Sequence, residues 1–388
     1  MQFDEDEDHE AIREAVRRVC SGFDDAYWAD LDDRHEFPWA FYDAMASGGW
    51  IGIAMPEAYG GGGQGITEAS ILLEEVAASG ACMNGASAIH LSIFGMHPVV
   101  VHGSEELKRR ILPDVAAGRM HVAFGVTEPD AGLDTTSITT RAVVDGDHYV
   151  VHGRKVWTSK ALESDKVLLL VRTTPKAEAA RPTDGMTLLV ADLKDPAVHI
   201  TAIPKLGRNA VASCEVVYDG LDVALADRVG EEGEGFRYLL SGLNTERILV
   251  AAEALGMGRA ALRRGVAYAK EREVFGRPIG SNQGVSFPLA EAHARLNAAA
   301  LVIREAAWRI DHNLPCGEQA NTAKYLAADA GFKAADVAVQ THGGFGYARE
   351  YHVERYFREA RLPRIAPVSQ EMVLNYLAEH VLGLPRSY

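Results

Sequence analysis

The sequence has no uninterrupted apolar run approaching the roughly 18 residues that a membrane-spanning helix requires, so we expect no membrane segment. It is also short of basic residues, with 39 Lys and Arg against 54 Asp and Glu and a formal net charge of −15. A nucleic-acid surface needs clustered Lys and Arg, and this balance therefore argues against nucleic acid as a partner.

Cysteine is scarce, and no two cysteines form a CxxC pair. Scattered thiols of this kind favour a reduced, cytoplasmic protein without a metal site. The stretch from Phe3 to His9 is acidic, whereas signal and transit peptides are basic and poor in acid, so neither is expected in the chain as given. The four cysteines are Cys20, Cys82, Cys214 and Cys316.

The 388 residues are enough for two or three domains, and the periodicity of apolar residues changes twice along them. Residues 8–118 read mostly as helices, for example Glu10 to Val19 and a run that opens at Thr67, with a glycine-rich loop over Pro56 to Gly65. Residues 121–222 read as short strands, with a hairpin turn at Asp145-Gly146-Asp147. From Phe236 onward the chain is again helical, in long alanine-rich segments. We therefore expect three domains, at 1–120, 121–230 and 231–388.

Two motifs far apart in the chain carry the strongest functional signal. Phe124 to Asp134 reads F-G-V-T-E-P-D-A-G-L-D, and Gln340 to Tyr347 reads Q-T-H-G-G-F-G-Y. Together with Phe275-Gly276 and Gln283, they resemble, in order and spacing, the flavin-binding landmarks of the acyl-CoA dehydrogenase family. The resemblance covers nearly the whole chain, from the turn at Met55 to Gly61 to the last helix.

This resemblance implies an α+β fold with an N-terminal helical domain, a middle β-barrel-like domain and a C-terminal four-helix bundle. It also implies FAD as the cofactor, an acyl-CoA thioester as the substrate and an electron-transferring flavoprotein as the electron acceptor. Members of the family are typically homotetramers, and a homotetramer or a dimer is expected here.

The first group of matching residues faces the flavin ring and its pyrophosphate. By resemblance, Phe124, Val126 and Thr127 lie at the pyrimidine edge and N5, while Trp157 and Ser159 lie against the isoalloxazine. Gly132 and Leu133 match the pyrophosphate turn, where Leu133 replaces the usual serine and removes one hydroxyl donor. Without the family, Trp157 would equally fit a domain-interface core.

The second group matches positions that hold the adenine end and pyrophosphate of a neighbouring subunit's FAD. A glycine pair suits that role because a chain without Cβ lets a phosphate approach the backbone closely. Taken alone, the pair Gly343-Gly344 would fit a helix terminator. Gly256 to Ala261 mimics a dinucleotide fingerprint, but it follows no strand and we reject it. The group consists of Arg272, Phe275, Gln283, Gln340, Gly343 and Gly344, and Ser369 is expected to keep a hydroxyl near the flavin.

The catalytic base is not where many family members carry it. Those members use a glutamate near the C-terminus, and the matching position here is Pro367, or Ala366 if the register slips by one residue. A second group, which includes the isovaleryl-CoA and long-chain types, carries the glutamate on a bundle helix, at a position that Glu246 occupies here. We therefore expect Glu246 to be the base, with burial raising its pKa toward about 6–7. Glu253, two turns along the same face, is the fallback.

Further substrate contacts follow from the same resemblance. Asn244 and Arg247 match residues that hold the CoA moiety, and a backbone N–H near Ala366 is expected to bind the thioester carbonyl. The helix around Ser87 to Val101 is expected to form the floor of the acyl site, but its residues do not fix a chain length. Glu246 in the first turns of a helix also suits the helix dipole without any catalytic role.

Two other functions stay open at the level of sequence. The altered C-terminal motif fits a flavin-dependent monooxygenase or oxidase on the same fold, although Glu246 and Arg247 argue against it. Intact flavin motifs also fit a non-catalytic subunit that binds FAD or CoA beside an active partner.

Overall fold

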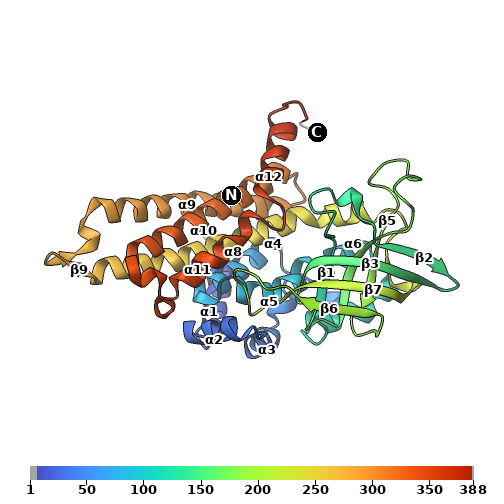
Figure 1. Ribbon diagram of the computed structural model, residues 1–388, viewed down its shortest axis with the longest axis horizontal. Helices are drawn as coiled ribbons and strands as arrows, with labels where there is room; N and C mark the ends of the chain where they lie inside the picture. Colours follow the sequence, from blue (N-terminus) through green and yellow to red (C-terminus); the bar gives the residue numbers. More distant parts are fainter. Residues whose placement is uncertain (1–6, 387–388) are drawn as a thin grey trace.

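The computed structural model describes residues 7–386, and the expectation for the acidic start falls partly outside this range. Figure 1 shows three parts along the long axis of the molecule: a bundle of long helices, a twisted sheet at the other end, and the N-terminal helices packed against both. The expected α+β fold is confirmed. Within residues 7–386, no helix combines the length and the apolar character needed to cross a membrane.

The N-terminal part is built from seven helices whose starts follow local sequence signals. Ser104 caps the last of them by accepting a hydrogen bond from the backbone N–H of Leu107, as its position before two glutamates predicts. The helix expected around Ser87 to Val101 is present as two shorter helices, and all thirteen residues of the first are buried. The helices are α1 (Glu7–Cys20), α2 (Asp25–Arg34), α3 (Trp39–Ser47), α4 (Ile66–Val76), the fully buried α5 (Cys82–Phe94), α6 (His97–His102) and α7 (Glu105–Ala116).

The middle part is a single eight-stranded mixed sheet. Its order is β6-β7-β3-β2-β4-β5-β8, and β1 pairs in parallel with β4 beside this path. The predicted turn at Gly146 joins β2 to β3 in an antiparallel hairpin, with Asp145 opposite His148. The strands are β1 (Val122–Gly125), β2 (Arg141–Asp145), β3 (His148–Ser159), β4 (Lys166–Arg172), β5 (Met186–Asp192), β6 (Val198–Ala202), β7 (Ser213–Ala224) and β8 (Arg228–Val229).

The C-terminal part is a bundle of long helices that pack closely through small residues. A Cβ added at Gly258 of α8 would lie 2.8 Å from the Cα of Gly331 on α10, and one at Gly256 would lie 2.1 Å from the carbonyl oxygen of Glu74 on α4. These two glycines therefore serve helix packing, which explains the false dinucleotide fingerprint. The elements are α8 (Gly235–Glu271), a short hairpin of β9 (Glu273–Val274) and β10 (Arg277–Pro278), α9 (Gln283–Asp311), α10 (Gly317–His342), α11 (Val353–Ala360) and α12 (Gln370–Tyr376).

One cross-domain cap fixes the helical domain on the bundle. The carboxylate of Asp311, the last residue of α9, accepts hydrogen bonds from the N–H groups of Ile66 at 2.7 Å and Thr67 at 2.9 Å. The Thr67 hydroxyl donates to the same carboxylate at 2.6 Å. Asp311 thus satisfies the open N-terminus of α4, whose own N-cap is a glycine without a side chain.

Candidate active site

The chain leaves the sheet at the carboxyl end of β1, where the sequence places the edge of the flavin. Phe124 is half-buried there, and Val126 and Thr127 follow it. Lys155 is fully buried and donates to the Val126 carbonyl and to Glu128 Oε1, each at 2.9 Å, so the turn is fixed from behind. Within the described part of the chain the Thr127 hydroxyl has no partner, which leaves it available to a ligand.

The buried pair behind this turn has strongly perturbed ionisation. Burial lowers the pKa of Lys155 to about 8. Burial acts to raise the pKa of Glu128, but the ammonium of Lys155 and hydrogen bonds from Thr139 and Thr140 outweigh it and lower that pKa to about 2. The carboxylate therefore stays charged and holds the turn rigid across the working pH range.

Trp157 stands out from the sheet at an irregularity in the pairing of β3 with β7. Its backbone is left-handed, with φ of 63°, and its side chain is 56% exposed. A bulge of this kind re-aims a side chain, and here it leaves the face of an indole ring open. Ser159, two residues on, accepts a 3.0 Å hydrogen bond from Arg208.

The turn expected to meet the pyrophosphate is open to solvent. Gly132 and Leu133 are exposed, Leu133 by 63%, and a Cβ on Gly132 would meet nothing within 4 Å. The exposed Leu133 side chain offers no hydrogen-bond donor, as the sequence indicates, so only backbone groups of this turn can serve a phosphate.

The second group of flavin-matching residues lies at the opposite end of the molecule. Phe275 is 99% exposed at the tip of the β9–β10 hairpin, where its φ of 55° and the φ of 75° at Gly276 form a two-residue turn. Gly343, with φ of 61°, and Gly344 have space for a Cβ with nothing within 4 Å. In Figure 1 this end, marked by β9, lies far from β1 and β3. The exposed neighbours at this end are Arg272, Gln283 and Gln340.

The two groups carry features that fit different parts of a flavin dinucleotide. The sheet end offers an open aromatic face, a free hydroxyl and an unobstructed glycine turn. The bundle end offers a second glycine turn and a fully exposed phenyl ring. Because the two ends lie far apart, one copy of the chain cannot bring both to the same ligand.

Glu246 lies on α8 with 8% of its surface exposed. Its carboxylate has no hydrogen-bond or ion-pair partner among residues 7–386. Burial raises its pKa to about 7, with the negative charge of Glu253 adding to the rise, while Arg247 and Lys324 oppose it. A buried, unpartnered carboxylate whose pKa lies near neutrality has the properties of a general base.

The neighbours of Glu246 on the same helix are arranged as the helical period predicts. Arg247 Nη1 donates to Asn244 Oδ1 at 3.0 Å and forms no ion pair with Glu246. Its Nε is buried and has no partner within the described chain. The guanidinium therefore keeps a donor free for an anionic or carbonyl group of a substrate.

Lys324 is a residue that the sequence analysis missed. It is fully buried on α10, donates to the Val368 carbonyl, and lies close enough to Glu246 to affect its charge. Burial, with Arg247 adding to the effect, lowers the pKa of Lys324 to about 8. The available signal was a lysine on the alanine-rich stripe that Ala320 and Ala327 mark as buried.

The backbone before α12 differs from the expectation that the N–H of Ala366 binds the thioester carbonyl. The backbone N–H of Ala366 already donates to the Leu362 carbonyl at 3.0 Å, so it is not available to a thioester carbonyl. Pro367 has no N–H at all. Ser369 is the N-cap of α12 and accepts a 3.3 Å hydrogen bond from the Met372 N–H. Among the described residues of this segment, the backbone N–H groups of Val368 and Ser369 have no hydrogen-bond partner.

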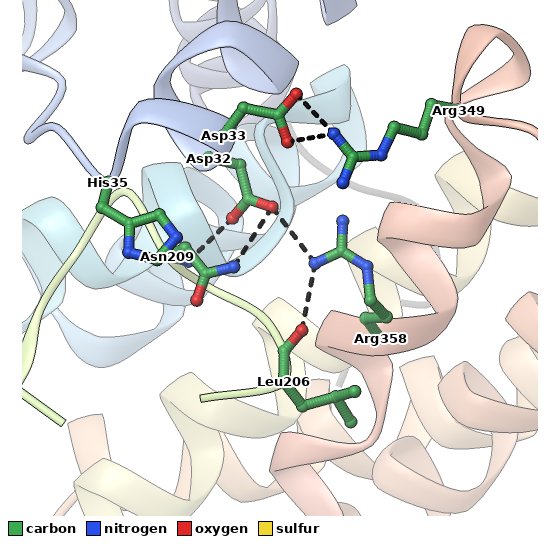
Figure 2. Close-up of a pocket in the computed structure, with 7 residues that line it drawn as sticks. All are labelled: Asp32, Asp33, His35, Leu206, Asn209, Arg349 and Arg358. Atoms are coloured by element: carbon green, nitrogen blue, oxygen red, sulfur yellow. Dashed lines mark hydrogen bonds and ion pairs between the residues drawn. The ribbon is translucent and has the colours of Figure 1, made fainter. Parts of the chain in front are cut away.

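Figure 2 shows a surface pocket on another face, between α2, the loop before β7 and α11. Its charged side chains pair with each other: Arg349 holds Asp33 through two 2.7 Å contacts, and Arg358 donates to Asp32 at 3.1 Å. No predicted site residue lines it. The charged pairs around this pocket therefore hold the three parts of the molecule together, and we call them the surface brace. The pocket is not the active site.

Comparisons with known proteins cover the chain from end to end. Residues 6–119 match the N-terminal domain of acyl-CoA dehydrogenase, residues 123–221 its middle domain and residues 233–382 its C-terminal domain.

Individual relatives and solved structures agree with this. Acyl-CoA dehydrogenase FadE12 of Mycobacterium tuberculosis is 39% identical over 392 residues, spanning 100% of this chain and 99% of the relative. Butyryl-CoA dehydrogenase of Megasphaera elsdenii superimposes with a TM-score of 0.93 at 27% identity, over 98% of this chain and 100% of that chain. A chain from a study of the electron transferring flavoprotein of Acidaminococcus fermentans superimposes with a TM-score of 0.92 at 30% identity, over 98% and 100%.

Proposed function

The chain belongs to the acyl-CoA dehydrogenase family and is an FAD-dependent oxidoreductase; from this premise we propose that it converts an acyl-CoA thioester to a trans-2-enoyl-CoA, with Glu246 as the base. One observation carries the proposal. Glu246 is a buried carboxylate without a partner, and its pKa of about 7 leaves it able to take a proton near neutral pH.

Different residues of the protein act on different parts of the substrate. Glu246 removes the proton from Cα of the acyl group, and its burial makes protonation less costly for it than for an exposed carboxylate. Arg247, held by Asn244, binds the CoA moiety through its free donor. The Val368 N–H, on a segment that Lys324 fixes, is the donor best placed in sequence to replace the Ala366 N–H at the thioester carbonyl.

Val126, Thr127, Trp157 and Ser159 would hold FAD, which would supply the acceptor for the hydride that leaves Cβ. The two glycine turns, one from each of two copies of the chain, would hold its pyrophosphate and adenine. We therefore include at least a dimer, and a homotetramer of two such pairs, in the proposal. An electron-transferring flavoprotein is the proposed acceptor of the electrons, in keeping with the relative solved in that context.

The test is anaerobic mixing of the FAD-loaded protein with a panel of acyl-CoA thioesters. We expect loss of the visible flavin absorbance and formation of the enoyl-CoA in the wild type. Glu246→Gln should keep bound, yellow FAD but lose turnover by about three orders of magnitude or more, within the range ascribed to a general base and its proton transfer. Glu318→Gln makes the same chemical change on an exposed position of α10 and should behave as the wild type.

The other outcomes separate the competing functions. If an acyl-CoA bleaches the flavin and admitted oxygen is then consumed in steady turnover, the protein is an oxidase. If no acyl-CoA bleaches the flavin but oxygen is consumed when a nicotinamide reductant is added with the substrate, it is a monooxygenase. A protein that binds FAD and CoA without either reaction is a partner subunit. Full turnover in Glu246→Gln would place the base elsewhere.

A further inference from the structure

A cluster of buried polar side chains lies about two turns beyond Glu246 along α8. It joins three elements: Glu253 from α8, Ser87 and His90 from α5, and Arg208 from the loop between β6 and β7. Each is at least nine-tenths buried, with exposed fractions between 0% and 7%. We call these four residues the polar floor.

The polar floor is connected by short contacts. His90 Nδ1 and Glu253 Oε1 are 2.7 Å apart. Arg208 donates from Nη1 to the Ser87 hydroxyl at 3.3 Å and from Nη2 to the hydroxyls of Ser159 at 3.0 Å and Ser213 at 2.5 Å. The positive charge of Arg208 and the negative charge of Glu253 are close enough to interact electrostatically.

These contacts leave some polar atoms of the floor without a hydrogen-bond partner. Glu253 Oε2 and Arg208 Nε are buried and have no hydrogen-bond partner within residues 7–386. A buried charged or polar atom without a partner is costly, and natural proteins rarely leave one without a functional reason. Here an unpaired acceptor and an unpaired donor occur within one cluster.

With Glu246 at the substrate Cα, the polar floor lies along α8 at the distance of the far end of an acyl chain. Glu246 marks the position of the substrate Cα, and Ser159, which Arg208 contacts directly, is expected to lie beside the flavin. Seven residues of α8 separate Glu246 from Glu253, a rise of about 10 Å. An acyl chain of roughly six to eight carbon atoms spans that length.

The surface brace of Figure 2 holds Arg208 in this inward position. Asp32 accepts from the Asn209 N–H at 2.7 Å, and Arg358 donates to the Leu206 carbonyl at 3.1 Å, so the loop is fixed on both sides of Arg208. Between these anchors Arg208 has a left-handed backbone with φ of 61°. The loop thus presents a guanidinium inward at a position that a relaxed backbone would not favour.

We propose that the substrate's acyl chain carries a hydroxyl group near its far end, which the polar floor recognises. The hydroxyl donates to Glu253 Oε2 and accepts from Arg208 Nε, so it satisfies both unpaired atoms at once. A plain alkyl chain leaves them unpaired, and a terminal carboxylate opposes the charge of Glu253. This inference rests on the proposed function, because it takes the position of the acyl group from Glu246.

The experiment compares matched thioesters on the FAD-loaded enzyme: hexanoyl-, octanoyl- and decanoyl-CoA, their ω-hydroxy counterparts, and the corresponding dicarboxylic monothioesters. We expect kcat/KM to favour one hydroxyacyl-CoA over its alkyl partner by at least about tenfold, because a site built to bind a hydroxyl discriminates against analogues that lack it. Glu253→Gln, which keeps the size of the side chain, should reduce that preference. Glu318→Gln should keep it.

Calorimetric binding of the same thioesters separates this inference from the reaction itself. Selective binding of a hydroxyacyl-CoA without turnover would support the polar floor and contradict the proposed dehydrogenation. Turnover with equal or greater preference for alkyl chains at every length would overturn the polar floor and leave the dehydrogenation standing. A preference that survives unchanged in Glu253→Gln would also overturn it.

Discussion

Replacing Glu246 by glutamine should stabilise the folded protein at alkaline pH while it removes activity. The ordinary pKa of the glutamate side chain is 4.5, and burial raises the pKa of Glu246 to about 7. Below pH 4.5 the group is protonated in both the folded and the unfolded state, so it does not lower the free energy of unfolding. Between 4.5 and about 7 only the unfolded chain releases the proton, so the free energy of unfolding falls as the pH rises through this window.

The size of the effect follows from the two pKa values. Their difference corresponds to about 3 kcal/mol of lost stability above pH 7, fully expressed once the folded-state carboxyl is charged. A glutamine carries no charge but still buries an amide, which offsets part of the gain. We therefore expect a net stabilisation of roughly 1–3 kcal/mol at pH 8 and little change near pH 5.

Thermal unfolding of the FAD-loaded protein measures this. Wild type, Glu246→Gln and Glu318→Gln are compared at pH 5 and pH 8, at equal protein and FAD concentrations because ligand binding also shifts the midpoint. The midpoint of Glu246→Gln should rise above that of the wild type by a few degrees at pH 8 only. An equal gain at both pH values, or a loss at pH 8, would refute the reasoning from burial.

Three further results are expected. The kcat/KM of the wild type should fall about tenfold for each pH unit below 7 and level off above it, because Glu246 must be deprotonated to act; a flat profile from pH 5 to 8 would contradict this. Gly344→Ala adds a Cβ in open space, so folding should be unchanged, while the ratio of bound flavin to protein should drop; unchanged flavin content would remove this glycine from the cofactor site. Asp311→Ala leaves the N–H groups of Ile66 and Thr67 without their acceptor and should cost about 2 kcal/mol in thermal stability, with Asp311→Asn intermediate.

Local signals predicted most of the fold. The hairpin at Gly146 and the long helices of the bundle have strong turn or periodicity signals, and the structure contains them. The helix expected around Ser87 to Val101 is divided into α5 and α6, and its bounds could not be read from the sequence because burial on all sides of α5 erases the contrast between a polar and an apolar face. The short helix α11 was missed, because its eight residues complete barely two turns.

In the candidate site, too, some features could be predicted from local sequence and others could not. Glu246, Arg247 and Asn244 lie on one helix, so their mutual arrangement follows from the helical period alone. The contact between His90 and Glu253 joins residues 163 positions apart, and no local pattern reports it. The engaged N–H of Ala366 was likewise invisible, because it depends on how one turn after α11 closes.

The distance between the sheet end and the bundle end of one protomer has a consequence for how two different mutations combine. In the assembly proposed above, Trp157 and Gly344 of one protomer would belong to two different cofactor sites. A protein altered at Trp157 and a protein altered at Gly344, mixed within one assembly, would then rebuild one intact site from their unaltered halves. Two such alleles together would then support more catalysis than either allele alone.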